Sequence, residues 1–219
     1  MSMYPSGLIR LEDSITHGAN SGAELFIVEG DSASGAVTAL RDRKLQAVLP
    51  MQGKPLNAIK ANASKVAEFP LYQALIEALG AGYGESFDMT KMRYQRIILL
   101  FDPDADGIHC SALMQIFSYR WMRPLLETGA VESVRAPLYE ISCGEKFAPV
   151  YAFSDDHYLT LCERLREKNF NDIRSQRYRG LAGINQPTLA ATCIHPTTRK
   201  TRVVNLAEVE LALQALGGM

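Results

Sequence analysis

Three aspartates at alternate positions are the residues of this sequence best suited to chemistry. They lie in the segment FDPDADG (101–107), directly after the apolar run Arg96–Phe101, which predicts a buried strand. Carboxylates two residues apart on extended backbone point to the same side, so Asp102, Asp104 and Asp106 can converge on one divalent cation or a pair of them. Without a cation, three carboxylates with no basic residue between them repel one another. The motif therefore predicts a metal site.

A fourth carboxylate, Glu29, ends another predicted strand, Glu24–Glu29, which leads into a predicted helix at 32–43. In a parallel sheet, the carboxyl ends of the strands line one crevice. We therefore expect Glu29 to share a site with Asp102 and Asp104. A glutamate and a D-x-D pair from two strands form a magnesium arrangement suited to phosphodiester chemistry.

Two other interpretations of the aspartate motif explain less of it. An EF-hand calcium loop that began at Asp102 would need its bidentate glutamate at Leu113, and a strand rather than a helix precedes the motif. In a capping turn, Asp106 would cap a helix that starts at Gly107, which leaves Asp102 and Asp104 unexplained.

The turn after Glu29 also excludes two familiar motifs. It is not a phosphate-binding P-loop, because Ala36 and Val37 follow Gly35 where a lysine and a hydroxyl residue belong. It is not the nucleophile elbow of a hydrolase, because Ser34 stands where that motif has glycine.

The elements that must position these residues alternate between strands and helices. Strands are predicted at 24–29, 45–49, 96–101 and 131–141, and helices at 32–43, 71–79 and 107–127. Pro50 should end the second strand, Pro137 should break the fourth, and Pro124 should kink the long helix. This succession predicts an α/β layer fold with a mostly parallel sheet flanked by helices. Beyond 147 the pattern weakens to a helix at 154–168, a short strand at 202–205 and a helix at 206–216.

Composition places the chain among ordinary globular proteins. Its 219 residues are 47% hydrophobic and 21% charged, which excludes wholesale disorder and suits one domain with a small appendage. The longest apolar run, at 97–101, is far too short for a membrane span, and the N-terminus lacks the layout of a secretory signal. We therefore expect a cytoplasmic protein with no membrane partner. The four cysteines form no C-x-x-C pair, which predicts buried reduced thiols.

Charge is unevenly distributed along the chain. The formal net charge is −1, yet 41–65 holds six basic residues and one acid, and 162–202 holds nine basic residues and three acids. Two basic stretches and one acidic motif could bind a polyanion and a divalent cation side by side. The alternative from charge alone is solvated surface.

The sequence resembles the Toprim domain of type IIA DNA topoisomerases, most closely the B subunits of bacterial DNA gyrase and topoisomerase IV. The similar segments follow the family's order over nearly the whole chain. They are ELFIVEGDSASG (24–35), RDRKLQAVLPMQGKPLN (41–57), RYQRIILLFDPDADGIH (93–109), YRWMRPLLETGAV (119–131), APLYEI (136–141), YRGLAGINQPTL (178–189) and HPTTRKTRVVNL (195–206). The resemblance implies a Rossmann-like Toprim core at 23–145, after an N-terminal segment (1–22) and before a C-terminal extension of the gyrase B type (146–219).

The resemblance also implies the roles of individual residues. Glu29 is similar to the family's metal ligand and proton-transfer glutamate, and Asp102 and Asp104 to its D-x-D metal ligands, with Asp106 as a third acid nearby. The metal implied is Mg²⁺, for which Mn²⁺ or Ca²⁺ can substitute. Lys54 resembles the family's phosphate-contacting lysine, which would lie nearest the scissile phosphate.

Further DNA contacts are expected in the second basic stretch. Arg174, Arg177 and Arg179 would contact phosphates farther along double-stranded DNA. His109 could touch a phosphate or make a structural hydrogen bond to the aspartate loop.

The resemblance implies partners as well. The family consists of ATP-hydrolysing isomerases that cleave DNA with a tyrosine carried by a gyrase A-type subunit, while the Toprim metals stabilise the bridging and leaving oxygens. The family's ATPase region is absent from this sequence, so we expect no ATP site in the chain and a separate ATPase subunit as a further partner. Three departures from the family, at Gln52, Pro103 and Ala182-Gly183, suggest that the chain is inactive alone.

Two alternative functions remain open. A freestanding Toprim enzyme would nick DNA in a metal-dependent reaction without a partner, and a non-catalytic module would bind gyrase A without cleavage.

Overall fold

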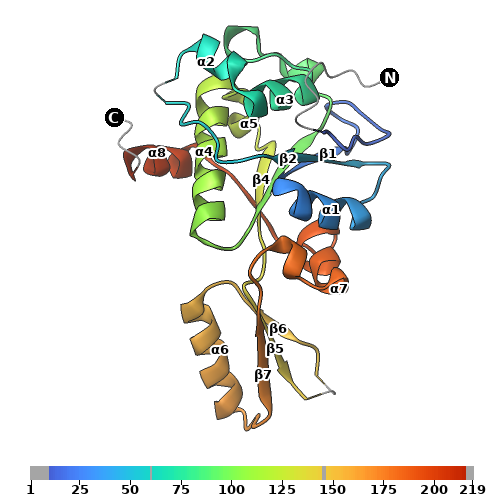
Figure 1. Cartoon of the computed structure of the whole chain (residues 1–219), viewed down its shortest axis with the longest axis vertical. Helices are drawn as coiled ribbons and strands as arrows, with labels where there is room; N and C mark the ends of the chain where they lie inside the picture. Colours follow the sequence, from blue (N-terminus) through green and yellow to red (C-terminus); the bar gives the residue numbers. More distant parts are fainter. Residues whose placement is uncertain (1–9, 60, 145–146, 216–219) are drawn as a thin grey trace.

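A five-stranded sheet is the centre of the larger of two bodies in the computed structural model of the protein, which describes residues 10–59, 61–144 and 147–215 (Figure 1). The strand order is β2-β1-β3-β4-β8. The strands are β1 (Glu24–Glu29), β2 (Gln46–Met51), β3 (Arg96–Phe101), β4 (Val131–Arg135) and β8 (Thr201–Val203). The first four run parallel, and β8 is antiparallel to β4. The mostly parallel α/β sheet that the sequence predicts is confirmed.

Helices cover both faces of this sheet because successive strand residues point to opposite sides. Leu25 and Ile27 of β1 face the side covered by α2 (Ala63–Glu68), α3 (Pro70–Leu79), α4 (Ala105–Trp121), α5 (Pro124–Glu127) and α8 (Leu206–Ala215). Phe26 and Val28 face the side covered by α1 (Gly30–Leu40), α7 (Gln186–Leu189) and the π-helical turn η4 (Ala190–Ile194). Short 3-10 helices η1 (Gly84–Ser86), η2 (Met89–Lys91) and η3 (Leu181–Gly183) complete the described elements of this body.

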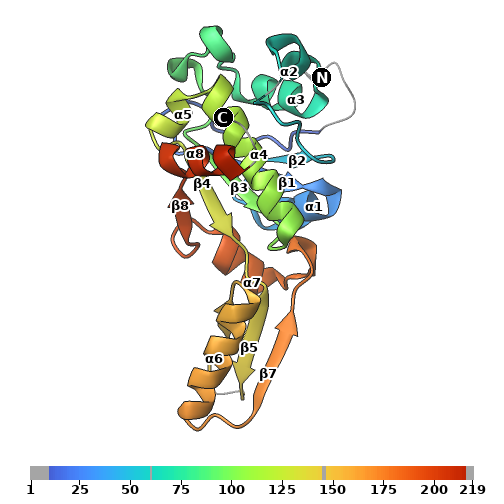
Figure 2. The ribbon, with the colours of Figure 1, turned by 90° about the vertical axis from the view of Figure 1, so that its left-hand side faces the viewer.

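A smaller body extends away from α2 and α3 in both views (Figures 1 and 2). It holds an antiparallel sheet in the order β6-β5-β7, together with α6 (Asp155–Glu167). Its strands are β5 (Tyr139–Cys143), β6 (Val150–Ala152) and β7 (Ile173–Arg177). The Toprim core is expected to end at residue 145, but the two sheets do not divide there. Strand β5 of the smaller sheet precedes residue 145, whereas β8 and α8 of the larger body follow it.

Two expectations about proline are wrong. Pro50 lies inside β2, which runs on to Met51, because β2 is an edge strand of the sheet, where a missing N–H is tolerated. Pro124 does not kink the long helix: α4 stops at Trp121, and Pro124 begins the separate helix α5. Pro137 does separate β4 from β5, as predicted, but the two strands belong to different sheets.

One feature predicted from composition is confirmed in the described residues. All four cysteines are free and buried. Among the helices of the described ranges, none is both long and apolar enough to cross a membrane.

A buried ion pair ties the late part of the chain to the start of β1. Arg199 contacts both carboxylate oxygens of Glu24, at 2.7 Å and 2.5 Å, and both side chains are about 2% exposed. Arg96 lies 2.6 Å from the same carboxylate, and Gln46 donates to it at 2.9 Å. Burial alone would raise the pKa of Glu24, but the hydrogen bonds from Arg199 and Gln46 outweigh it and lower the pKa.

Arg199→Met should therefore destabilise the fold by about 3 kcal/mol, because it leaves a buried carboxylate without its main partner. Urea unfolding at pH 7 would measure this as a lower midpoint with an unchanged m value. The double variant Glu24→Gln/Arg199→Met is the control and should recover part of the loss. A single variant as stable as the parent would contradict the assignment.

The pH dependence has a defined sign. Because the folded-state pKa of Glu24 is lowered, its stabilising contribution is present above the ordinary glutamate pKa and is lost as the pH falls through the lowered value. Acid-induced loss of stability should therefore be shallower in the double variant than in the parent.

Candidate functional site

The four predicted acids lie near the point where the strand order reverses. From β1 the chain crosses to β2 on one side, and from β3 it crosses to β4 on the other, so β1 and β3 flank a topological switch point. The two strands are parallel neighbours in register, with Ile27 opposite Leu99. Glu29 is the last residue of β1, and Asp102 directly follows β3. The site's location thus follows from the strand order.

Charge interactions show that these carboxylates are close to one another. Burial raises the pKa of Glu29 most, and the negative charges of Asp102, Asp104 and Asp106 raise it further, while Lys54 opposes them. Lys54 Nζ lies 3.4 Å from Asp106 Oδ1, with both side chains largely exposed. The site is therefore an acidic cluster, consisting of Glu29, Asp102, Asp104 and Asp106, with Lys54 at its edge.

Each aspartate has a distinct environment. Asp102 Oδ1 accepts a hydrogen bond of 2.8 Å from the backbone N–H of Leu181. Burial raises the pKa of Asp102, this hydrogen bond lowers it, and Asp104 raises it again, with a net upward shift. Asp104 Oδ1 accepts from the backbone N–H of Gly107 at 2.9 Å and is the N-cap of α4. The capping role considered for Asp106 is therefore wrong, because the helix begins at Ala105 and Asp106 already lies in its first turn.

The convergence of three carboxylates on one point is not present. Among the described residues, no group of three His, Cys, Asp or Glu side chains is close enough to hold a metal ion. The reason is local: β3 ends at Phe101, so the spacing rule for extended backbone does not apply to Asp104 and Asp106.

The donor set nevertheless fits a divalent cation. All four groups are carboxylates, the hard oxygen ligands that Mg²⁺ prefers. The raised pKa values of Glu29 and Asp102 are partly the result of uncompensated negative charge, which a bound cation would relieve.

Backbone around Asp102 is closely packed, and two glycines make this possible. A Cβ atom at Gly107 would lie 2.1 Å from the Asp102 carbonyl oxygen. One at Gly180 would lie 2.8 Å from Asp102 Oδ2. The contact of Gly180 and Leu181 with Asp102 was not predicted from the sequence, because a backbone N–H carries no residue-type signal. The sequence marked these two residues only as part of YRGLAGINQPTL, one of the segments that resemble the family.

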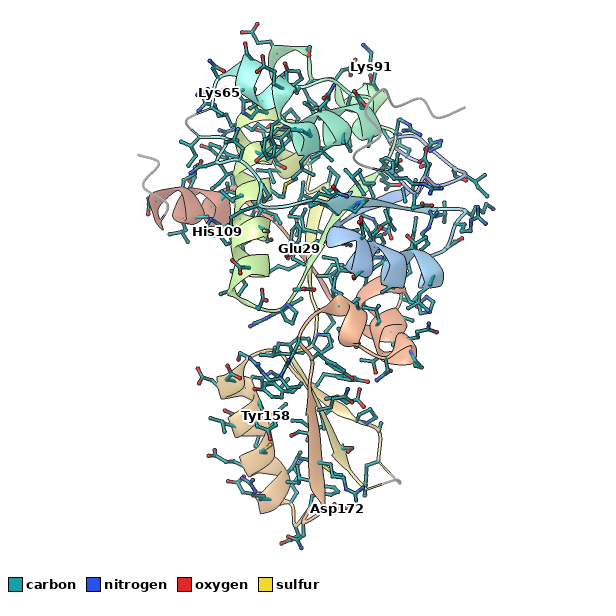
Figure 3. All side chains as sticks on the ribbon, viewed as in Figure 1. Glu29, Lys65, Lys91, His109, Tyr158 and Asp172 are labelled. Atoms are coloured by element: carbon teal, nitrogen blue, oxygen red, sulfur yellow. The ribbon has the colours of Figure 1, made fainter. Side chains whose placement is uncertain are left out.

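The predicted DNA contacts are spread over both bodies. Arg179 is exposed and lies two residues before Leu181, close to the acidic cluster. Arg177 ends β7 and lies over the Tyr139 ring, 5.8 Å from its centre. Arg174 pairs with Asp172 at 3.1 Å, and Figure 3 labels Asp172 at the far tip of the smaller body. The structure therefore does not bring Arg174 to the acidic cluster.

His109 is half-buried in the first turns of α4, close in sequence to the aspartates of the motif (Figure 3). Within the described ranges, no hydrogen bond joins it to another residue, so the structural bond to the aspartate loop is not formed. A phosphate contact by His109 stays a prediction.

Known proteins resemble this chain over most of its length. The family model "Toprim domain" matches residues 24–135, which is more than half of the chain. The DNA gyrase B protein of Archaeoglobus fulgidus is 42% identical over 189 residues, covering 86% of this chain and 29% of the relative. The DNA gyrase B protein of Thermotoga maritima is 43% identical over 190 residues, covering 86% of this chain and 29% of the relative. That of Thermus thermophilus is 41% identical over 197 residues, covering 88% of this chain and 30% of the relative.

The chain thus spans about three tenths of the length of these relatives. Both strands that carry the acidic cluster lie within the matched residues. The chain belongs to the Toprim family and corresponds to the Toprim region of type IIA DNA topoisomerases related to the DNA gyrase B protein.

Proposed function

We propose that this chain is the metal-binding, DNA-positioning module of a type II DNA topoisomerase and completes a cleavage site whose tyrosine lies on a gyrase A-type partner. The observation that carries the proposal is the acidic cluster at the switch point of a Toprim sheet, with Lys54 at its edge. The relatives named as DNA gyrase B proteins support the choice of reaction.

Mg²⁺, or Mn²⁺ or Ca²⁺ in its place, would be held by Glu29, Asp102, Asp104 and Asp106 and would stabilise negative charge on the phosphodiester oxygens. Glu29 would also pass a proton to an oxygen of the cleaved strand, the role that its resemblance to the family's glutamate implies. Lys54, paired only with an exposed carboxylate, can exchange Asp106 for a DNA phosphate.

The tyrosine that precedes the Gly180–Leu181 contact with Asp102 is unsuited to attack. Tyr178 lies three residues before Leu181 and is buried, with its hydroxyl donating to Glu140 Oε2 at 2.5 Å. Burial and the neighbouring Glu140 raise the pKa of Tyr178, which disfavours the phenolate. This favours a nucleophile supplied by a partner. We place the module in the cytoplasm.

Mg²⁺ should raise the melting temperature of the protein. At a concentration a hundred times Kd, binding would stabilise the fold by about 2.7 kcal/mol, a shift of several degrees for a chain of this size. Asp102→Asn/Asp104→Asn should abolish the shift, and because asparagine is also a good N-cap, α4 should remain folded. A double variant that responds to Mg²⁺ like the parent would refute the site assignment.

Glu29→Gln should stabilise the metal-free protein while removing its response to Mg²⁺. The folded-state pKa of Glu29 is raised, so its ionisation weakens folding, and the metal-free parent should become more stable as the pH falls through that pKa. We expect the variant to melt about 1–3 °C higher than the parent at pH 8 without metal. Calorimetric melting at pH 5 and pH 8 would test this, and a lower melting temperature for the variant at pH 8 would contradict it.

The proposed reaction is tested by mixing the chain with a gyrase A-type subunit, supercoiled DNA and Mg²⁺, then denaturing and measuring DNA covalently attached to protein. The parent should form the adduct only with the partner present. Lys54→Ala should lower its yield about tenfold through a lost phosphate contact, whereas the exposed control Lys91→Ala should not.

Nicking by the chain alone would instead favour the freestanding enzyme. Partner binding without any adduct would favour the non-catalytic module.

A further inference from the structure

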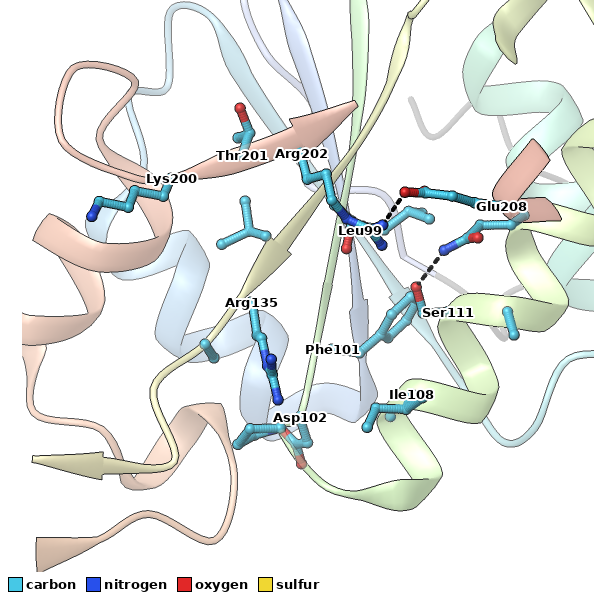
Figure 4. Close-up of a pocket in the computed structure, with 17 residues that line it drawn as sticks. Leu99, Phe101, Asp102, Ile108, Ser111, Arg135, Lys200, Thr201, Arg202 and Glu208 are labelled. Atoms are coloured by element: carbon cyan, nitrogen blue, oxygen red, sulfur yellow. Dashed lines mark hydrogen bonds and ion pairs between the residues drawn. The ribbon is translucent and has the colours of Figure 1, made fainter. Parts of the chain in front are cut away.

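A cleft of about 680 Å³ opens beside Asp102 on the face of the sheet that α4 only partly covers (Figure 4). Its floor is formed by β3, β4 and β8. Leu99 lies opposite Ser133, and Ser133 opposite Arg202, so these side chains share one face of the sheet. The N-terminal half of α4 forms one wall. The volume falls in the range of about 300–1,000 Å³ that is usual for ligand sites.

Three basic side chains line this cleft against two acidic ones, in a protein whose formal net charge is −1. Arg202 pairs with Glu208. Arg135 and Lys200 are exposed, and in the described part of the chain no ion pair or hydrogen bond occupies their side chains. The second acidic residue is Asp102, a member of the acidic cluster. The cleft therefore offers two cations that are free to bind an anion.

Hydroxyl groups add further donors. Ser111 Oγ accepts from Gln115 Nε2 at 3.1 Å, which leaves its own O–H available to donate. Ser133 lies opposite Arg202 on the same face of the sheet and adds a second hydroxyl to the lining. Serine and threonine hydroxyls, together with arginine and lysine, are the side chains that usually contact DNA phosphates.

The arrangement of the cations selects an extended anion over a compact one. Figure 4 shows Arg135 pointing toward Asp102, Lys200 on the far side of the cleft and Arg202 turned toward Glu208. The three side chains point in different directions around the cleft and do not converge on one point. A single small anion would need donors that converge on it. The successive phosphates of a nucleic-acid strand can instead contact cations that are set apart from one another.

We propose that this cleft binds the sugar–phosphate backbone of a DNA strand as it leaves the acidic cluster. The cleft would form a second phosphate track. In the strand order, Lys54 follows β2 on one side of Asp102, and the cleft lies on the other side. The track runs along β4 and β8 of the larger body rather than to Arg174 at the tip of the smaller one. This inference rests on the proposed function, because it assumes that DNA lies at Asp102.

The test compares the parent with three variants: Arg135→Gln/Lys200→Gln in the cleft, Lys54→Gln at the cluster, and Arg10→Gln/Lys91→Gln as a control. The control makes the same change in charge as the cleft variant, at two exposed residues outside both basic stretches, and Figure 3 shows Lys91 at the far end of the larger body. Binding of a fluorescent DNA duplex would be measured over a KCl series at fixed Mg²⁺, with the A-type partner present. The log–log salt slope should fall by about 1.8 for the cleft variant, about 0.9 for Lys54→Gln, and remain unchanged for the control.

The outcomes separate the inference from the proposed function. If the cleft variant keeps the parent's slope while Lys54→Gln reduces it, the cleft proposal fails and the proposed function stands. If both variants match the control, both proposals fail. Inorganic phosphate is the last probe: a cleft variant that loses phosphate binding but keeps the DNA slope would mark a small-anion site and overturn the proposal.

Discussion

The structure depends on holding like charges together at one edge of the sheet. Glu29 and Asp102 end neighbouring parallel strands, and α1 and α4 begin soon after them, so neither carboxylate can withdraw without disrupting a strand-to-helix turn. Burial and, after it, the repulsion from the neighbouring aspartates raise the pKa of Glu29. The apolar core beneath them and the buried Glu24–Arg199 pair at the opposite end of β1 supply the stability that offsets this repulsion. A divalent cation would turn the repulsion into attraction.

A late segment of the chain completes this site. After β7 the chain returns to the larger body, where the N–H of Leu181 binds Asp102. The return is fixed by Glu140 of β5, whose Oε2 accepts from Tyr178 at 2.5 Å and from Thr188 at 3.1 Å. The smaller body is therefore linked to the acidic cluster through a short hydrogen-bonded path.

Much of the fold could be predicted because its signals are local. The apolar runs of β1 and β3 identify buried strands, and the rule for parallel sheets then brings Glu29 close to Asp102. The rest depends on contacts that residue types do not encode. Asp104 rather than Asp106 caps α4, because the helix begins two residues before its predicted start at Gly107. Strand β7 has exposed polar side chains and no alternation, so only its pairing with β5 defines it.

The central claim is that the acidic cluster holds a divalent cation. Crystals of the full chain grown with Mn²⁺ would test it most directly, through an anomalous-difference map. The account predicts a peak in contact with the carboxylates of Glu29 and Asp102, with Asp102 still bonded to Leu181. Fully occupied Mn²⁺ sites elsewhere on the molecule, with no peak between these two carboxylates, would contradict a metal site at the acidic cluster.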